Sequence, residues 1–196
     1  MIVCIDSGNT RIKWGVRDAD NWLAQGALAH AELAGLDVLL SQWKPSSVLL
    51  SNVAGPQALA GIQQALAPWQ GLVSEVRSGA SGLDVRNGYD NPAQLGVDRW
   101  CALIGARGIT TAACLVVMAG TATTIDTLDA SGQFRGGLIL PGPDLMRRAL
   151  ARDTAALPLA NGDHDHFPRN TDDAIFSGCL EAQLGAIERA FTRIAG

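Results

Sequence analysis

One stretch near the N-terminus decides the predicted fold: Ile2-Val3-Cys4-Ile5-Asp6-Ser7-Gly8-Asn9-Thr10. Its apolar start, residues 2–5, is typical of a short buried strand. The polar residues that follow include Gly and Asn, which suit the positive φ angles of a tight turn. Beyond the turn, Ile12, Trp14 and Val16 alternate with charged or small residues, which is the period of a half-buried strand. We therefore predict a strand, a polar turn and a second strand.

The same pattern returns later in the chain. Residues 114–118 form an apolar strand-like run, Gly120 takes the place of Gly8 in the following turn, and a Thr-rich strand comes next. Such a repeat indicates an internal duplication. We expect an α/β protein built from two related halves, residues 1–108 and residues 109–196.

The remaining segments extend both halves. In the first half the predicted order is β-β-β-α-β-α-β, and the second half repeats only its beginning. The further predicted strands are residues 23–28, 48–50, 72–76 and 134–140, and the predicted helices are residues 33–43, 56–66, 144–152 and 171 onward. Residues 158–170 are typical of a loop, and Thr171 is expected to cap the last helix. We expect that the second half lacks a C-terminal piece of its fold, or that a partner completes it.

Composition narrows the classes of function. The 196 residues are 47% hydrophobic and 17% charged, which fits a globular protein with a sizeable core. The net charge is −4 and there are only two lysines, so a nucleic-acid groove is not expected. No apolar run approaches the roughly 18 residues of a membrane span, and no signal peptide is evident. The four cysteines are scattered without ligand spacing. We therefore expect a reduced, cytoplasmic protein.

Two glycine-containing turns of this kind could clamp phosphate. Backbone N–H groups near Gly8 and Gly120 can donate to phosphate oxygens. Side-chain donors come from Asn9, Thr10, Thr121 and Thr123. Asp6, which ends the first strand, is a candidate holder of Mg²⁺ beside those phosphates. The alternative is two ordinary β-turns, one of them capped by an Asp.

A third group of residues is Gly96-Val97-Asp98-Arg99, which opens an apolar-periodic helix. A carboxylate in the first turn could act as a general base for a hydroxyl. The alternative is an Asp that merely favours the helix dipole, with Arg99 on the surface. Just upstream, Tyr89 is the only tyrosine, and a turn tyrosine is more often a packing residue than a ligand contact.

His164 and His166 form a His-Asp-His motif that could bind a metal. No third ligand lies near them in the sequence, and the surrounding segment is typical of a loop. The sequence alone therefore does not favour a metal site here.

Together these motifs resemble the type III pantothenate kinases, most closely the β-proteobacterial, Bvg accessory factor-like branch. The resemblance runs across the whole chain with the motifs in family order. The motifs are Asp6-Ser7-Gly8-Asn9-Thr10, Asn87-Gly88-Tyr89, Gly96-Val97-Asp98-Arg99, Gly120-Thr121-Ala122, Gly136-Gly137 with Pro141-Gly142, and Asn170-Thr171 with Gly178. The resemblance implies an acetate kinase/Hsp70/actin-like (ribonuclease H-like) fold of duplicated halves, with ATP in the cleft between them.

The resemblance also implies an activity and roles. Family members are phosphotransferases that phosphorylate pantothenate with ATP, the first step of coenzyme A synthesis. Asp98 would be the general base. The first phosphate loop would be Asp6, Ser7, Gly8, Asn9, Thr10, Arg11, Ile12 and Lys13, the second loop would contribute Thr121, and pantothenate would meet Tyr89, Gly96, Val97, Asp98, Arg99 and Thr171. Thr171 would come from the neighbouring subunit of a homodimer.

One departure from the family pattern concerns its monovalent cation, K⁺ or NH₄⁺. Family members usually have an Asp two residues before the Gly-Thr of the second loop, and this chain has Met118. A thioether is a poor ligand for a hard cation, so we do not expect K⁺ here. Two other hypotheses stay open: a different small-molecule kinase of the superfamily, and a nucleotide-binding accessory protein with weakened catalysis.

Overall fold

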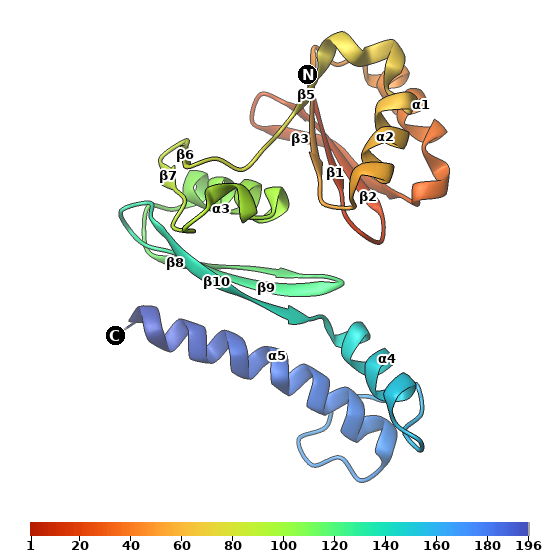
Figure 1. Cartoon of the computed structure of the whole chain (residues 1–196), viewed down its shortest axis with the longest axis vertical. Coiled ribbons are helices and arrows are strands. Elements are labelled where there is room, and N and C mark those ends of the chain that lie inside the picture. The colour runs from red at the N-terminus through yellow and green to blue at the C-terminus, as the bar shows by residue number, and fades with distance from the viewer. Residues whose placement is uncertain (196) are drawn as a thin grey trace. The chain divides into compact units, whose positions relative to one another are not determined.

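A computed structural model describes residues 1–195 and divides them into two compact units (Figure 1). Unit 1 comprises residues 1–79 and 93–101, and unit 2 comprises residues 80–92 and the described residues from 102 onward. The division falls inside helix α3 (Val97–Ile109), whereas the sequence placed the boundary between two functional halves at residues 108 and 109. The functional halves stay a prediction.

Unit 1 is built on a five-stranded sheet with the order β3-β2-β1-β4-β5. Strand β1 pairs antiparallel with β2 through a hairpin. On its other side it pairs parallel with β4, which the chain reaches by a crossover connection. The elements are β1 (Ile2–Ser7), β2 (Ile12–Asp18), β3 (Asn21–Leu28), α1 (Ala34–Trp43), β4 (Ser47–Asn52), α2 (Pro56–Ala65) and β5 (Val73–Glu75). Short 3₁₀ helices lie at His30–Glu32, Ala67–Leu72 and Pro92–Gln94. This is the predicted β-β-β-α-β-α-β order, which is confirmed.

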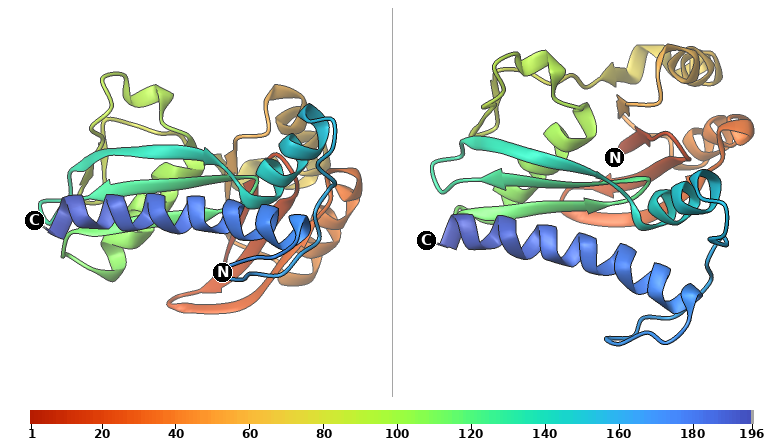
Figure 2. Two further views of the ribbon diagram at one scale, coloured as in Figure 1. Left: turned by 90° about the horizontal axis from the view of Figure 1, so that it is seen from below. Right: turned by 60° about the horizontal axis from the view of Figure 1, so that its bottom comes forward.

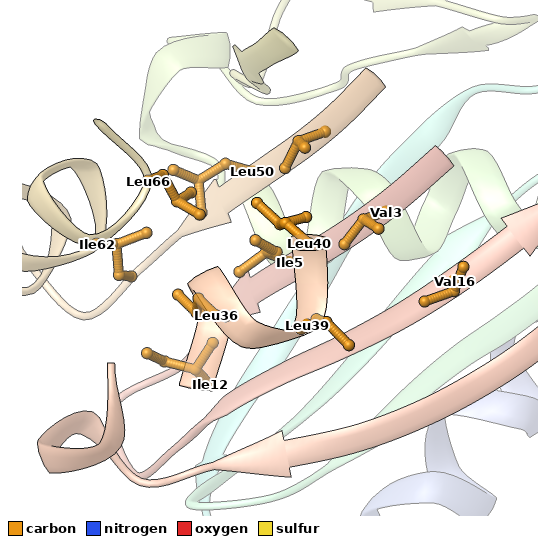
Figure 3. Packing of buried hydrophobic residues seen from close by; sticks show 11 residues of the cluster. Val3, Ile5, Ile12, Val16, Leu36, Leu39, Leu40, Leu50, Ile62 and Leu66 are labelled. Atoms are coloured by element: carbon orange, nitrogen blue, oxygen red, sulfur yellow. The ribbon is translucent and has the colours of Figure 1, made fainter. Parts of the chain in front are cut away.

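The core of unit 1 lies between this sheet and its helices. Strand residues alternate, so Val3 and Ile5 of β1 point to one face, where Figure 3 shows them beside Leu36 and Leu40 of α1. All four side chains are at most 2% exposed. Because close-packed aliphatic side chains hold β1 in place, they also fix the polar turn at its end.

Unit 2 contains a three-stranded antiparallel sheet with the order β10-β9-β8. Its elements are β6 (Ser81–Gly82), β7 (Val85–Arg86), β8 (Cys114–Ala119), β9 (Ala122–Leu128), β10 (Phe134–Pro141), α4 (Pro143–Asp153) and α5 (Thr171–Ala195). Both views of Figure 2 show α5 running alongside the sheet. Within residues 1–195, no helix combines the length and apolar character needed to cross a membrane.

The two units repeat one motif. In unit 1 the order β3-β2-β1 comes from three consecutive antiparallel strands, and β10-β9-β8 in unit 2 has the same connectivity. Gly8 follows β1 and Gly120 follows β8, as the internal sequence repeat predicted. The structure therefore contains the predicted pair of strand-turn-strand hairpins.

Candidate active site

The first turn is a compact loop with its donors exposed. The Gly8 N–H donates to the Arg11 carbonyl over 3.2 Å and closes the turn. Asn9, Thr10 and Arg11 are exposed at its tip. His30 Nε2 lies 2.8 Å from the Gly8 carbonyl oxygen, so the 3₁₀ helix after β3 braces the loop. A braced loop with exposed amide, hydroxyl and guanidinium donors suits a polyphosphate.

Asp6 presents a carboxylate at the start of this loop. Its Oδ1 accepts a hydrogen bond from Ser51 Oγ at 2.8 Å, and its Oδ2 lies 3.6 Å from Lys13 Nζ. The Asp6 side chain is 34% exposed, so its oxygens can reach a ligand. A hard oxygen donor oriented by a neighbouring hydroxyl fits Mg²⁺, and Lys13, at 63% exposed, is free to turn toward phosphate.

Two predicted phosphate-loop residues point inward instead. Ile12 and Ser7 are both fully buried, and the Ile12 side chain belongs to the unit 1 core. The Ser7 hydroxyl has no hydrogen-bond partner among the described residues. Contact of either residue with phosphate would therefore have to use the backbone.

Asp98 sits in the first turn of α3, as predicted. Its Oδ1 accepts the N–H of Arg99 at 2.8 Å, and Gly96 lies directly against it. A Cβ added to Gly96 would come within 2.6 Å of that oxygen. The glycine therefore leaves the space that the carboxylate occupies. Arg99 is only 4% exposed, so the alternative interpretation of this motif, which put Arg99 on the surface, is wrong on that point.

Asp98 and Asp6 share one region of unit 1 although 92 positions separate them. Both carboxylates act on Cys101, one helical turn after Asp98. Burial raises the pKa of the Cys101 thiol, and the negative charges of Asp6 and Asp98 raise it further. A thiolate there would be repelled by both groups, so both carboxylates lie within electrostatic range of this thiol. The predicted base and the predicted Mg²⁺ ligand therefore belong to the same unit, and both act on the electrostatics of Cys101.

The second turn lies in unit 2. Gly120 N–H donates to the Ala122 carbonyl at 3.1 Å, and the Thr121 carbonyl accepts the N–H of Gly142 at 2.9 Å. Any side chain at Gly142 would collide with the Gly120 and Thr121 carbonyls. The Pro141-Gly142 pair thus allows the chain leaving β10 to pack against this turn. Thr121 remains exposed.

Tyr89 lies at the other end of the unit 2 sheet. Its ring is tilted against the Phe134 ring, with centroids 5.4 Å apart, and its N–H is held by Asn87 Oδ1 at 3.1 Å. Phe134 pairs with Leu128, whereas Thr121 precedes the first residue of β9. Unit 2 therefore does not bring Tyr89 and Thr121 together.

The cap of α5 differs from the expectation. Asn170 Oδ1 accepts the Asp173 N–H at 2.9 Å, which makes Asn170 the N-cap, and Asn170 Nδ2 donates back to Asp173 at 2.6 Å. The prediction that Thr171 caps the helix was wrong. Thr171 is the exposed first helical residue, and its side chain has no hydrogen-bond partner within residues 1–195.

Sequence reasoning missed two supporting residues of the first loop. His30 contacts Gly8 across 22 positions, and Ser51 contacts Asp6 across 45. Ser51 follows an apolar strand that pairs with β1, and the register places it opposite Asp6. That parallel pairing was the only signal that could have pointed to Ser51, and nothing in the sequence indicates His30.

Comparison with known proteins decides the family. The sequence profile of the type III pantothenate kinases matches residues 2–193. The chain belongs to the type III pantothenate kinase family. The type III pantothenate kinase of Dechloromonas aromatica is 57% identical over 195 residues, which are 99% of this chain and 82% of that protein. The enzyme of the same name from Aromatoleum aromaticum is also 57% identical, over all of this chain and 81% of its own length.

A solved structure supports the fold. A Campylobacter jejuni protein of the Baf family superposes with a TM-score of 0.62 at 23% identity, covering 96% of this chain and 78% of its own. The type III pantothenate kinase family membership and the repeated hairpins together give the chain the predicted acetate kinase/Hsp70/actin-like, ribonuclease H-like fold.

Proposed function

We propose that the chain transfers the γ-phosphoryl group of ATP to the terminal hydroxyl of pantothenate, giving 4′-phosphopantothenate and ADP. This is the first step of coenzyme A synthesis, and the cytoplasm is the compartment that goes with this proposal. Family membership supports the reaction class. The observation that carries the proposal is the match of the type III pantothenate kinase family over residues 2–193, which includes both predicted phosphate loops and Asp98.

Asp98 acts as the general base. The substrate hydroxyl oxygen forms a bond to the γ-phosphorus, the bond from that phosphorus to the bridging oxygen breaks, and ADP leaves. The hydroxyl proton passes to the Asp98 carboxylate. Asp98 holds its position because Gly96 leaves room for Oδ1 and the Arg99 N–H donates to it. One carboxylate oxygen bound to backbone leaves the other to receive the proton.

The first loop binds the phosphates of ATP. Residues 8–11 supply backbone and side-chain donors, Lys13 supplies a mobile positive charge, and Thr121 of the second loop adds a hydroxyl. Asp6 would hold Mg²⁺, which neutralises phosphate charge when it is bound with ATP. Because the Ser51 hydroxyl donates to Oδ1 of Asp6, the carboxylate keeps its orientation toward the loop when Lys13 turns to phosphate.

Pantothenate binding is assigned to Tyr89, Gly96, Val97, Asp98, Arg99 and Thr171. A homodimer with shared sites is supported by distances within unit 2. Ala190 of α5 lines one hollow with Arg135, which follows Phe134 and so lies near the ring that Tyr89 contacts. From Ala190 back to Thr171 the helix extends about 28 Å at 1.5 Å per residue. That span exceeds the reach of one small substrate, so Thr171 and Tyr89 of the same chain would serve different sites.

The monovalent cation of the family is assigned no role here. Met118 lies in β8 opposite Thr124, where the family pattern has an Asp. The thioether offers no charge and no oxygen to K⁺ or NH₄⁺. Activity should therefore not depend on either ion.

The test of this function is ADP release measured with ATP, Mg²⁺ and a panel of alcohols. We expect turnover with pantothenate and none above background with simple sugars. Turnover only with a sugar would favour another kinase of the superfamily. ATP binding without ADP release on any substrate would favour the accessory-protein hypothesis.

A further inference from the structure

Outside this site, unit 2 carries a cluster of side chains of the types that commonly bind metal ions. His164 and His166 come from the long loop before α5, and Glu181 comes from α5 itself. One ligand atom from each residue lies within 4.8 Å of the others. The sequence motif offered only the two histidines, and the fold brings in a third ligand from 15 positions beyond His166.

The spacing of these atoms matches a small divalent metal. His164 Nε2 lies 3.3 Å from Glu181 Oε1. With metal–ligand bonds of about 2.0–2.1 Å, neighbouring ligand atoms of a tetrahedral Zn²⁺ site lie about 3.3 Å apart. The two imidazole rings stand edge to face at 81°, with centroids 5.3 Å apart. A ligand atom of His166 lies within 4.8 Å of the other two, so all three residues can reach one ion.

The loop that carries the histidines is fastened to α5 in register. The Asp163 N–H donates to Asp173 Oδ1 at 2.9 Å, and the Asp165 N–H donates to Ser177 Oγ at 3.0 Å. Asp173, Ser177 and Glu181 are four residues apart and share one helix face. Four helical residues rise about 6 Å, and two extended residues advance about 6.6 Å. Each advance of two loop residues therefore matches an advance of four helix residues. This match brings the histidines to the next position on the same helix face, Glu181.

Two features show that this arrangement is built into the chain. Ser177, which anchors the residue between the histidines, is 3% exposed. Gly162 passes so close to the helix that a Cβ there would lie 2.5 Å from the Asp172 carbonyl carbon and the Asp173 nitrogen. With Asp165 tied to the helix, both histidines are held beside Glu181.

We infer that His164, His166 and Glu181 form a binding site for a divalent transition metal of the Zn²⁺ class, and that the metal clamps the loop to α5. Two imidazoles and a carboxylate suit Zn²⁺, Ni²⁺ or Cu²⁺ and do not suit Mg²⁺, which prefers oxygen ligands. All three residues are exposed, so water can fill the remaining position and the metal can enter from solvent. The site is independent of the proposed kinase reaction.

The test is equilibrium dialysis of the full chain against Zn²⁺ in excess Mg²⁺, followed by metal analysis and calorimetry. We expect one Zn²⁺ per chain. His166→Ala and Glu181→Gln should each weaken binding by more than the about 10- to 100-fold loss typical of changes around the ligands. Glu188→Gln is the matched control, because it removes the same charge from an exposed position two turns further along α5 and should leave affinity unchanged.

Limited proteolysis with trypsin tests separately whether the metal holds the loop against α5. Arg169 is an exposed tryptic site in the same loop, and Arg77, 80% exposed, is a reference site in unit 1. Zn²⁺ should slow cleavage after Arg169 several-fold relative to Arg77, and Glu181→Gln should abolish that protection. Zn²⁺ binding that survives both ligand variants would place the metal elsewhere, at the cysteines for example, and would overturn the inference. Absence of saturable binding, or binding without protection, would also overturn it.

Discussion

Replacing Gly96 by Ala tests how the catalytic carboxylate is placed. The added Cβ would lie 2.6 Å from Asp98 Oδ1, and ordinary van der Waals contact begins at 3.4 Å. The Asp98 oxygen must therefore move by about 0.8 Å or the side chain must rotate. A misplacement of about 1 Å in a reacting group can cost about 10²-fold in rate. We expect kcat of Gly96→Ala to fall between about tenfold and 10²-fold.

The assay is steady-state ADP release with saturating ATP and pantothenate, alongside thermal unfolding. Gly105→Ala in the same helix is the matched control, because no atom lies within 4 Å of its new Cβ. It should keep full activity and gain slightly in stability, since Ala favours a helix interior over Gly. If Gly96→Ala keeps kcat within twofold of the unmodified protein, the space beside Gly96 does not position Asp98 and the reasoning is wrong.

Three further predictions concern other parts of the site. Asp6→Asn should raise the KM for Mg²⁺-ATP while leaving the unfolding temperature nearly unchanged, and an unaltered KM across a Mg²⁺ titration would remove Asp6 from metal binding. Asn170→Ala should lower the free energy of unfolding, measured by denaturant titration, by about 1 kcal/mol because it removes the cap of α5. Thr171→Ala should instead weaken pantothenate binding, measured directly, without that loss of stability. Exchange of K⁺ for Na⁺ should leave the rate unchanged because of Met118, and strong activation by K⁺ would contradict this.

Much of the fold follows from local patterns. The run Ile2-Val3-Cys4-Ile5 and the turn after it predict the first hairpin, because buried strands and tight turns each have a sequence signature within a few residues. The repeat at Gly120 predicts the second hairpin for the same reason. The position of Asp98 in a first helical turn follows from the helical period after it.

What could not be predicted depends on contacts between distant segments or on a choice between similar residues. The Ser51 and His30 contacts with the first loop require the sheet register and the path after β3. Asn170 and Thr171 are both good helix caps, and only the backbone geometry selects Asn170. Glu181 joins the two histidines because a loop follows α5 in register, which no local pattern encodes.

The central claim is that Asp98 accepts the hydroxyl proton of pantothenate. Its most direct test is the Asp98→Asn variant, which keeps the size of the side chain and the oxygen that accepts the Arg99 N–H. Turnover should fall by about 10²–10⁴-fold, the usual contribution of a positioned base, while the affinity for Mg²⁺-ATP stays within a few-fold. Near-normal ADP release by Asp98→Asn with pantothenate would contradict the account.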